Sequence, residues 1–257
     1  MARPQDTPVT SLRVEPIKKV STHLEVLHRL GDEIRQGRLR GGDRLPPERQ
    51  LAEMLQVSRT SLRGGLAVLE AVGLVRSQPG SGPRAGTFML SEPGTNMNEI
   101  LSLQVALSHF DVADVVDFRR SIESAAVMRL AADPEHYDLS VAEKLIDESV
   151  DAKRPEMFAP YDVDFHVELV RLGSNRLSVY MVQMCRDVLE DRMLAGFKTL
   201  DDWDEARELF IDHHRGILDA IRSGDPASAV NALLKHVTGP RGYRQAAEEA
   251  ARGRERT

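Results

Sequence analysis

The chain has 257 residues, of which 41% are hydrophobic and 29% charged, a composition typical of a soluble protein with enough apolar residues for one or two cores. Its single cysteine, Cys185, excludes a disulfide framework and a cysteine-rich zinc module. No apolar run is long enough for a membrane helix, and the N-terminus lacks the apolar segment of a secretory signal, so we expect a cytoplasmic protein with no membrane partner.

The formal net charge of −6 is unevenly distributed along the chain. Residues 1–90 contain 14 basic and 9 acidic residues, whereas residues 91–257 contain 20 and 31. A basic N-terminal third joined to an acidic remainder indicates an anion-binding module attached to a module of another kind. Chance segregation of charge is the alternative explanation.

The N-terminal third predicts three helices and a hairpin. Residues 1–15 show no periodicity and are expected to form a flexible tail. Helical spacing and stop signals then predict one helix ending before Gly37, a short one opened by Pro46-Pro47, and a third from Ser58 to about Val72. Two short strands around a loop rich in glycine and proline follow. This order predicts a winged helix-turn-helix, which binds DNA, over residues 16–90.

The third helix would be the one that reads DNA. Arginine binds guanine with two hydrogen bonds, hydroxyl groups bind phosphates and bases, and a helix N-terminus attracts phosphate. As alternatives, the two arginines fit an ordinary exposed helix face, and the first serine fits a plain N-cap. The candidate side chains in its first turns are Ser58, Arg59, Thr60, Ser61 and Arg63.

The rest of the chain predicts an all-helical module. Residues 91–96 have the composition of a linker, residues 97–248 carry helical stripes, and residues 249–257 are expected to form a frayed tail. The fold class expected for the whole chain is therefore mainly α, with the hairpin as its β structure. The stripes predict helices over 97–108, 111–132, 135–152, 155–172, 176–196, 201–223 and 226–248.

Spacing within this module indicates a metal site. Asp162 and His166 are four residues apart and share a helix face, which provides half of a divalent-metal site. His214 and His236 stand ten residues on either side of the turn 224–226, so two antiparallel helices would bring them level. His213 would point about 100° away from His214, toward the surface. The alternative is a set of ordinary histidines bonded to carbonyl groups.

The N-terminal module resembles the DNA-binding signature of the GntR family of bacterial transcription regulators. The resemblance is carried by Leu45-Pro46-Pro47-Glu48-Arg49, Val57-Ser58-Arg59-Thr60, Leu69-Glu70 and Gly73-Leu74-Val75. It implies DNA contacts by Arg49, Ser58, Arg59, Thr60, Ser61 and Arg63, with the wing tip near Gly80 approaching the minor groove. Two features depart from the family pattern. Gly64-Gly65 replaces the usual Glu-Ala, so the helix is either soft or closely packed there, and residues 81–85 lengthen the wing.

The C-terminal module is similar to the FCD ligand-binding domain of the FadR subfamily. The matching segments are Val116–Glu123, Asp162–His166, Gly173-Ser174-Asn175, His214–Leu218 and His236. The resemblance implies an all-helical FCD-type bundle that holds a divalent metal through Asp162, His166, His214 and His236. Zinc is expected first, although nickel or manganese suits the same ligands.

The resemblance also assigns a role to Arg119, whose guanidinium would clamp the carboxylate of an effector. The alternative is a surface pair with Glu123 at i, i+4. Together these features predict a homodimeric regulator, expected to be a repressor, that binds a pseudo-palindromic double-stranded DNA operator and responds to a small organic acid. It would associate with the nucleoid when bound to DNA. A metal-responsive regulator and a metal-dependent enzyme are the alternatives, and no nucleophile signature supports the enzyme.

Overall fold

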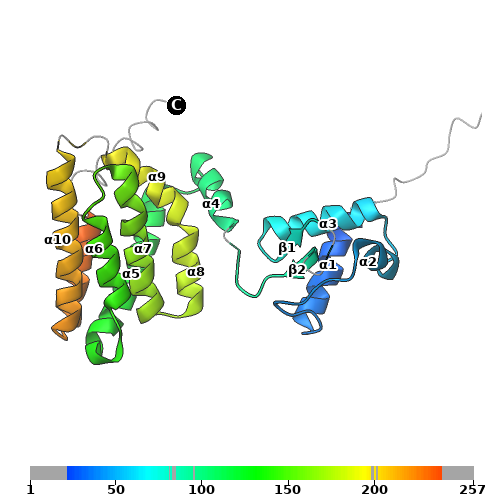
Figure 1. Cartoon of the computed structure of the whole chain (residues 1–257), viewed down its shortest axis with the longest axis horizontal. Coiled ribbons are helices and arrows are strands. Elements are labelled where there is room, and N and C mark those ends of the chain that lie inside the picture. The colour runs from blue at the N-terminus through cyan, green and yellow to red at the C-terminus, as the bar shows by residue number, and fades with distance from the viewer. Residues whose placement is uncertain are drawn as a thin grey trace, which may run out of the picture. The chain divides into compact units, whose positions relative to one another are not determined.

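The computed structural model describes residues 22–238, apart from residues 81, 83, 84, 95, 198, 199 and 201. The expected tails, 1–15 and 249–257, and the expected helical turns beyond residue 238 lie outside the described residues. The chain divides into two units between Glu92 and Pro93 (Figure 1). Each unit is built around its own hydrophobic core.

The N-terminal unit has the predicted winged helix-turn-helix order. Its elements are α1 (Thr22–Arg35), α2 (Glu48–Met54), α3 (Arg59–Ala71), β1 (Val75–Gln78) and β2 (Gly86–Met89). The strands pair antiparallel in the register Val75↔Met89 to Gln78↔Gly86. The segment before α2 adds a bridge on the other edge of β2, between Arg44 and Phe88.

Local signals in the sequence determine where α3 begins and ends. The Ser58 side chain accepts a hydrogen bond from the backbone N–H of Ser61, which satisfies one of the free donors at the start of the helix. The chain turns away at Gly73, whose φ of +70° is favourable for glycine. Leu62, Leu66 and Leu69 on the inner face of α3 are buried in the core of this unit.

The glycine pair in α3 marks the place where α1 packs most closely. A Cβ atom at Gly65 would lie 2.6 Å from Cγ1 of Val26 and 3.0 Å from the carbonyl oxygen of His23. At Gly64 the nearest atom would be Cβ of His23, at 3.1 Å. Of the two expectations for this departure from the family pattern, close packing therefore describes Gly65.

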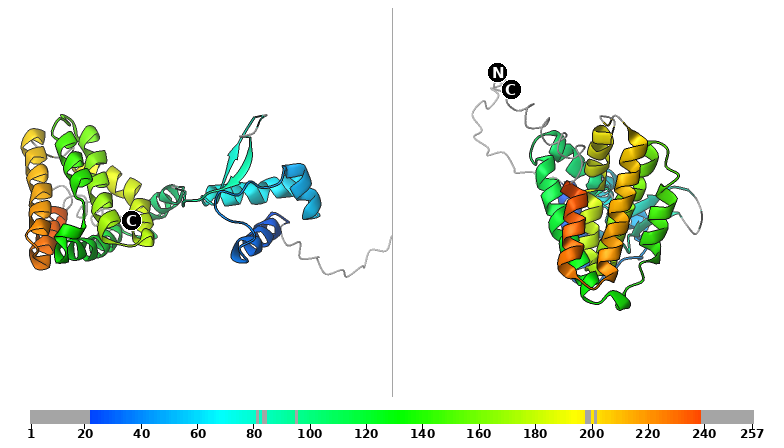
Figure 2. Two further views of the ribbon diagram at one scale, coloured as in Figure 1. Left: turned by 60° about the horizontal axis from the view of Figure 1, so that its bottom comes forward. Right: turned by 90° about the vertical axis from the view of Figure 1, so that its left-hand side faces the viewer.

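The C-terminal unit is entirely helical over its described residues (Figure 2). Two of the predicted helices differ from the observed ones. The helix expected over 135–152 starts only at Ser140, because Pro134–His136 forms a short 3₁₀ turn and the side chain of Asp138 accepts from the N–H of Ser140. The helix expected over 176–196 is interrupted at Cys185. The elements are α4 (Met97–Ala106), α5 (Val112–Ala132), η1 (Pro134–His136), α6 (Ser140–Ser149), α7 (Pro155–Gly173), α8 (Arg176–Met184), α9 (Arg186–Phe197), α10 (Trp203–Arg222) and α11 (Pro226–Thr238).

The helices that carry the candidate site form the centre of this unit. α5 packs against α7, α10 and α11, and α10 and α11 pack against each other after the turn at Gly224, whose φ is +72°. Buried side chains from these helices, including Phe158, Leu169, Ile217 and Leu233, share one hydrophobic core. No described helix has both the length and the apolar character needed to cross a membrane.

Candidate functional site

Four side chains from three helices meet inside the C-terminal unit. Asp162 and His166 lie one turn apart on α7, His214 lies on α10 and His236 on α11. Each is only 1% exposed, and one potential ligand atom from each lies within 4.8 Å of the others. The antiparallel arrangement of α10 and α11 around Gly224 brings the two later histidines level, as the spacing predicts.

The closest contacts converge on the Asp162 carboxylate. Its Oδ1 lies 3.1 Å from Nε2 of His214 and 3.5 Å from Nε2 of His236, and these two nitrogens are 3.2 Å apart. Four buried polar atoms of the cluster have no hydrogen-bond partner among the described residues, namely Oδ2 of Asp162, Nδ1 and Nε2 of His166, and Nδ1 of His236. Unsatisfied buried acceptors beside facing imidazole nitrogens are what a metal ion would satisfy. The residues therefore fit a divalent metal.

Aromatic rings surround the cluster. The ring of Phe165 lies 4.3 Å from that of His214, and Phe158 stacks nearly parallel to His214 at 6.3 Å. Phe210, whose ring lies 6.0 Å from that of Phe158, meets the His236 ring edge-on at 5.9 Å. All three phenylalanines are at most 1% exposed, so this shell restricts water and strengthens the electrostatic interactions within the cluster.

Burial acts in opposite directions on the two kinds of titratable group. It would raise the pKa of the Asp162 carboxyl, but hydrogen bonds from His214 and His236 outweigh burial and hold that pKa well below its usual range. Burial lowers the pKa of His166, His214 and His236. At neutral pH the cluster thus presents a carboxylate and neutral imidazoles, which are the protonation states that bind metal.

Arg119 lies beside this cluster rather than on the surface. It is 3% exposed and pairs with Glu123, which is fully buried, so the i, i+4 pair named as the alternative is present but lies in the core and not on the surface. The other carboxylate oxygen of Glu123, Oε2, lies 3.0 Å from Nδ1 of His166. Burial would raise the pKa of Glu123, but the positive charge of Arg119 and the contact with His166, which is protonated only at low pH, outweigh burial and lower this pKa to about 2.

The candidate DNA-reading residues lie at the start of α3 and of α2. Arg59 and Thr60 are exposed, and no polar partner of Arg59 is found among the described residues. Ser58 acts as the N-cap, and its hydroxyl also lies 2.9 Å from the hydroxyl of Ser61. Arg49, at the start of α2, lies 3.7 Å from Glu53 and is largely exposed. A dipole-bearing helix start with exposed cations suits a phosphate backbone.

Arg63 already has a partner without DNA. Its Nε donates to Oε2 of Glu48 at 2.7 Å, which joins α3 to the start of α2. The wing begins nearby, and Gly80 at its tip has a φ of +132° with no atom within 4 Å of its would-be Cβ. Arg44 supports the base of the wing by donating to the carbonyl of Ala85 and lying over the ring of Phe88.

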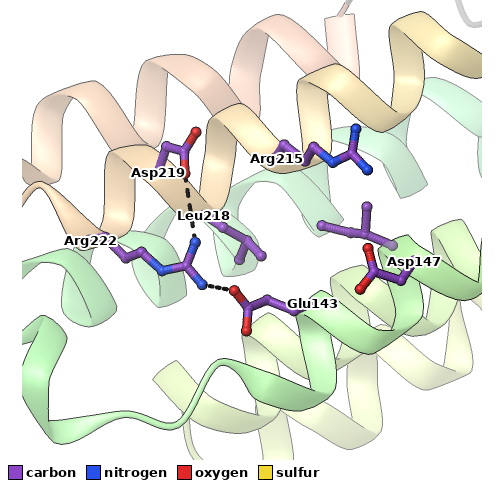
Figure 3. Close-up of a pocket in the computed structure, with 7 residues that line it drawn as sticks. Glu143, Asp147, Arg215, Leu218, Asp219 and Arg222 are labelled. Carbon is purple, nitrogen blue, oxygen red and sulfur yellow. Dashed lines mark hydrogen bonds and ion pairs between the residues drawn. The ribbon is translucent and has the colours of Figure 1, made fainter.

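A separate groove of about 370 Å³ lies between α6 and α10 (Figure 3). Arg222 bridges its walls by pairing with Glu143 on α6 and with Asp219 on its own helix. Because this arginine is already matched by carboxylates of the groove, we do not assign a ligand to it.

Sequence reasoning did not predict that Glu48 pairs with Arg63, or that the second carboxylate oxygen of Glu123 reaches His166. Glu48 belongs to the motif Leu45–Arg49, but its position there does not indicate a contact with Arg63 on the next helix. Glu123 lies four residues from Arg119, but this spacing indicates neither the burial of Glu123 nor its contact with His166. His213 also differs from expectation, because it is half-buried and its ring lies 6.0 Å from that of His236. Asp164, which lies between Asp162 and His166 in the sequence, is not part of the cluster and pairs with Arg186 at 2.8 Å.

Comparisons with known proteins agree for both units. Residues 22–84 match the bacterial regulatory proteins of the gntR family, and residues 114–239 match the FCD domain. The HTH-type transcriptional repressor NanR of Escherichia coli is 30% identical over 236 residues, covering 88% of this chain and 86% of its own. The HTH-type transcriptional regulator LutR of Bacillus subtilis is 28% identical, covering 80% and 93%. The solved structure of a Streptococcus agalactiae GntR protein covers 84% of this chain and 97% of its own, with 22% identity and a TM-score of 0.56, and it supports the fold.

Proposed function

This chain belongs to the gntR family, in the FadR-like subfamily with an FCD domain, and we propose that it is a dimeric repressor controlled by a small organic acid. The relatives that it matches are transcription regulators and not enzymes, and the same holds for this chain. The repressor assignment is supported by the similarity to NanR, which is named as a repressor. Such a regulator would work in the cytoplasm, where its operator lies.

DNA binding is proposed for the N-terminal unit. Arg59 and Arg63 on α3 would contact base edges in the major groove, and Arg49 would contact phosphate. Ser58, Thr60 and Ser61 would supply hydroxyl and backbone N–H groups at the helix start, and the wing near Gly80 would approach the minor groove. A two-fold dimer would place two such helices on a pseudo-palindromic operator.

The effector site is proposed at the buried cluster, and this cluster is the observation that carries the regulatory part of the proposal. Asp162, His166, His214 and His236 would hold a divalent ion, with zinc expected first. The bound ion would supply positive charge that attracts a carboxylate. Arg119 would provide the second anchor, because a guanidinium binds a carboxylate with two parallel hydrogen bonds.

Regulation would follow from unequal binding. An acid that binds one conformation of the C-terminal unit more tightly shifts the population toward it, and operator affinity changes by the same coupling free energy. Typical couplings of about 1–3 kcal/mol correspond to changes in affinity of about 5- to 150-fold.

The experiment selects operator sequences from a random DNA pool with the purified full-length protein. Binding is then measured by fluorescence anisotropy for metal-loaded and chelator-stripped protein, with and without a panel of small carboxylic acids. We expect tight binding to a two-fold symmetric site and release by one acid only when metal is present. Release by metal alone would instead support a metal sensor. Failure to select any DNA would refute the proposed DNA binding, and selection of a half-site bound by a monomer would refute the dimeric assignment.

A further inference from the structure

Glu123 joins the metal-ligand cluster to Arg119, because its two carboxylate oxygens face different partners. Oε1 accepts a hydrogen bond from Nε of Arg119 within α5, while Oε2 lies 3.0 Å from Nδ1 of His166 on α7. All three side chains are at most 3% exposed. Neither Oε2 nor Nδ1 has a hydrogen-bond partner among the described residues, and their 3.0 Å separation makes each the polar group available to the other.

We infer that Glu123 is a positioning residue that fixes the ring orientation and tautomer of His166 for metal binding. The inference rests on the proposed function, since it concerns the same cluster. A carboxylate beside Nδ1 favours the tautomer with hydrogen on Nδ1, which leaves the lone pair of Nε2 for a metal. Nε2 of His166 has no hydrogen-bond partner among the described residues, as a ligand atom requires.

The bridging position specifically requires a carboxylate. Nε–H of Arg119 and Nδ1–H of His166 both need an acceptor, and a carboxylate offers one oxygen to each. Glutamine has nearly the same shape but offers one oxygen and one NH₂ group. In Glu123→Gln, either the NH₂ group faces the guanidinium, or it faces His166 and favours the tautomer with hydrogen on Nε2. Both outcomes break one arm of the bridge.

A matched control is available on the same helix as His166. Glu168 is buried with 7% exposure and pairs with Arg171, whose side chain is 54% exposed, so Glu168→Gln removes the same charge from a buried carboxylate that also pairs with an arginine. It lies two residues from His166 and therefore points to a different side of α7. If removing any buried carboxylate from this bundle lowers metal affinity, both variants should lose affinity to a similar extent.

The first measurement uses Co²⁺ alone as the probe, with affinity obtained by chelator competition and the ligand environment from the visible absorption of the bound ion. Disturbing a carboxylate behind a metal-bound histidine usually costs about 10- to 100-fold in metal affinity. We expect a loss of that size and an altered spectrum in Glu123→Gln, with both unchanged in Glu168→Gln. Equal affinity in Glu123→Gln and the parent protein, or equal losses in the two variants, would overturn the inference.

The second measurement needs no bridge variant and no metal. Long-range ¹H–¹⁵N spectra of the metal-free parent protein, recorded at mildly alkaline pH, report which ring nitrogen of His166 carries hydrogen, and a His166→Asn variant identifies its signals. We expect hydrogen on Nδ1, and hydrogen on Nε2 would overturn the inference. This result stands even if Glu123→Gln fails to fold. If the parent protein binds no Co²⁺, the proposed metal site fails, and the tautomer alone decides the role of Glu123.

Discussion

Replacing Gly65 with alanine should destabilise the N-terminal unit, although alanine favours helices. The substitution removes a helix-propensity penalty of about 1 kcal/mol. However, the new methyl group would lie 2.7 Å from Cβ of Val26 and 3.0 Å from the carbonyl oxygen of His23. Rotation of the Val26 side chain moves neither atom, so α1 itself has to shift. Overpacking of this kind costs about 1–3 kcal/mol. Because the backbone of α1 must move, we expect an overpacking cost in the upper part of that range. After the gain in helix propensity is subtracted, the free energy of unfolding should fall by about 1–2 kcal/mol.

Urea denaturation of the full-length chain can assign this loss to one unit. Trp203 is the only tryptophan and lies in α10, so its fluorescence follows the C-terminal unit, whereas circular dichroism follows both units. With an m value of about 1–2 kcal/mol/M, the N-terminal midpoint should fall by about 1 M while the fluorescence midpoint stays constant. Gly64→Ala is the control, because the nearest atom to its new methyl group, Cβ of His23, lies at 3.1 Å, so a shift of only a few tenths of an ångström relieves the contact. Equal stability of Gly65→Ala and the parent protein would refute the packing argument.

Four further outcomes are expected. Arg59→Ala should weaken operator binding about 10- to 100-fold in an anisotropy titration, because a base contact is worth about 1–3 kcal/mol. Unchanged affinity would show that Arg59 does not contact the operator. His214→Ala should reduce the metal content found by elemental analysis and lower the melting temperature, whereas His213→Ala should keep its metal. Equal metal content in the two variants would contradict metal binding by the cluster. Cys185 should react slowly with a thiol reagent near pH 8, because burial raises its pKa from 9.0 to about 11 and so leaves about a hundredfold less thiolate. Rapid labelling of the native protein would instead show that the thiol is accessible. Arg119→Ala should still bind the operator but no longer release it when the acid is added, and release at the parental concentration would make the arginine purely structural.

The sequence predicts most elements of the fold because their boundaries are determined locally. Ser58 caps α3 through its own hydroxyl, and Gly73 ends that helix because its backbone adopts a positive φ. The 3₁₀ turn at Pro134–His136 was harder to predict, because helical periodicity continues through it in the sequence. The interruption at Cys185 has no glycine or proline to signal it.

The candidate site was predictable where it depends on helical spacing. His214 and His236 meet because their helices are antiparallel and their distances from the intervening turn are equal. The role of Glu123 was not predictable, because the i, i+4 relation to Arg119 is the same on a surface as in a core. Only the packing of α5 against α7 brings its second oxygen to His166. Long-range contacts between helices carry the information that spacing along one helix lacks.

The order of the two units along the chain has a consequence for synthesis. The N-terminal unit is complete at Glu92, whereas the buried cluster requires His236, which lies 144 residues later. At about 5–20 residues per second, a ribosome takes roughly 7–30 s to cover this interval, and domains generally fold as units from the N-terminus. Each new chain can therefore have a folded N-terminal unit for several seconds before His236, the last residue of the cluster, has been added.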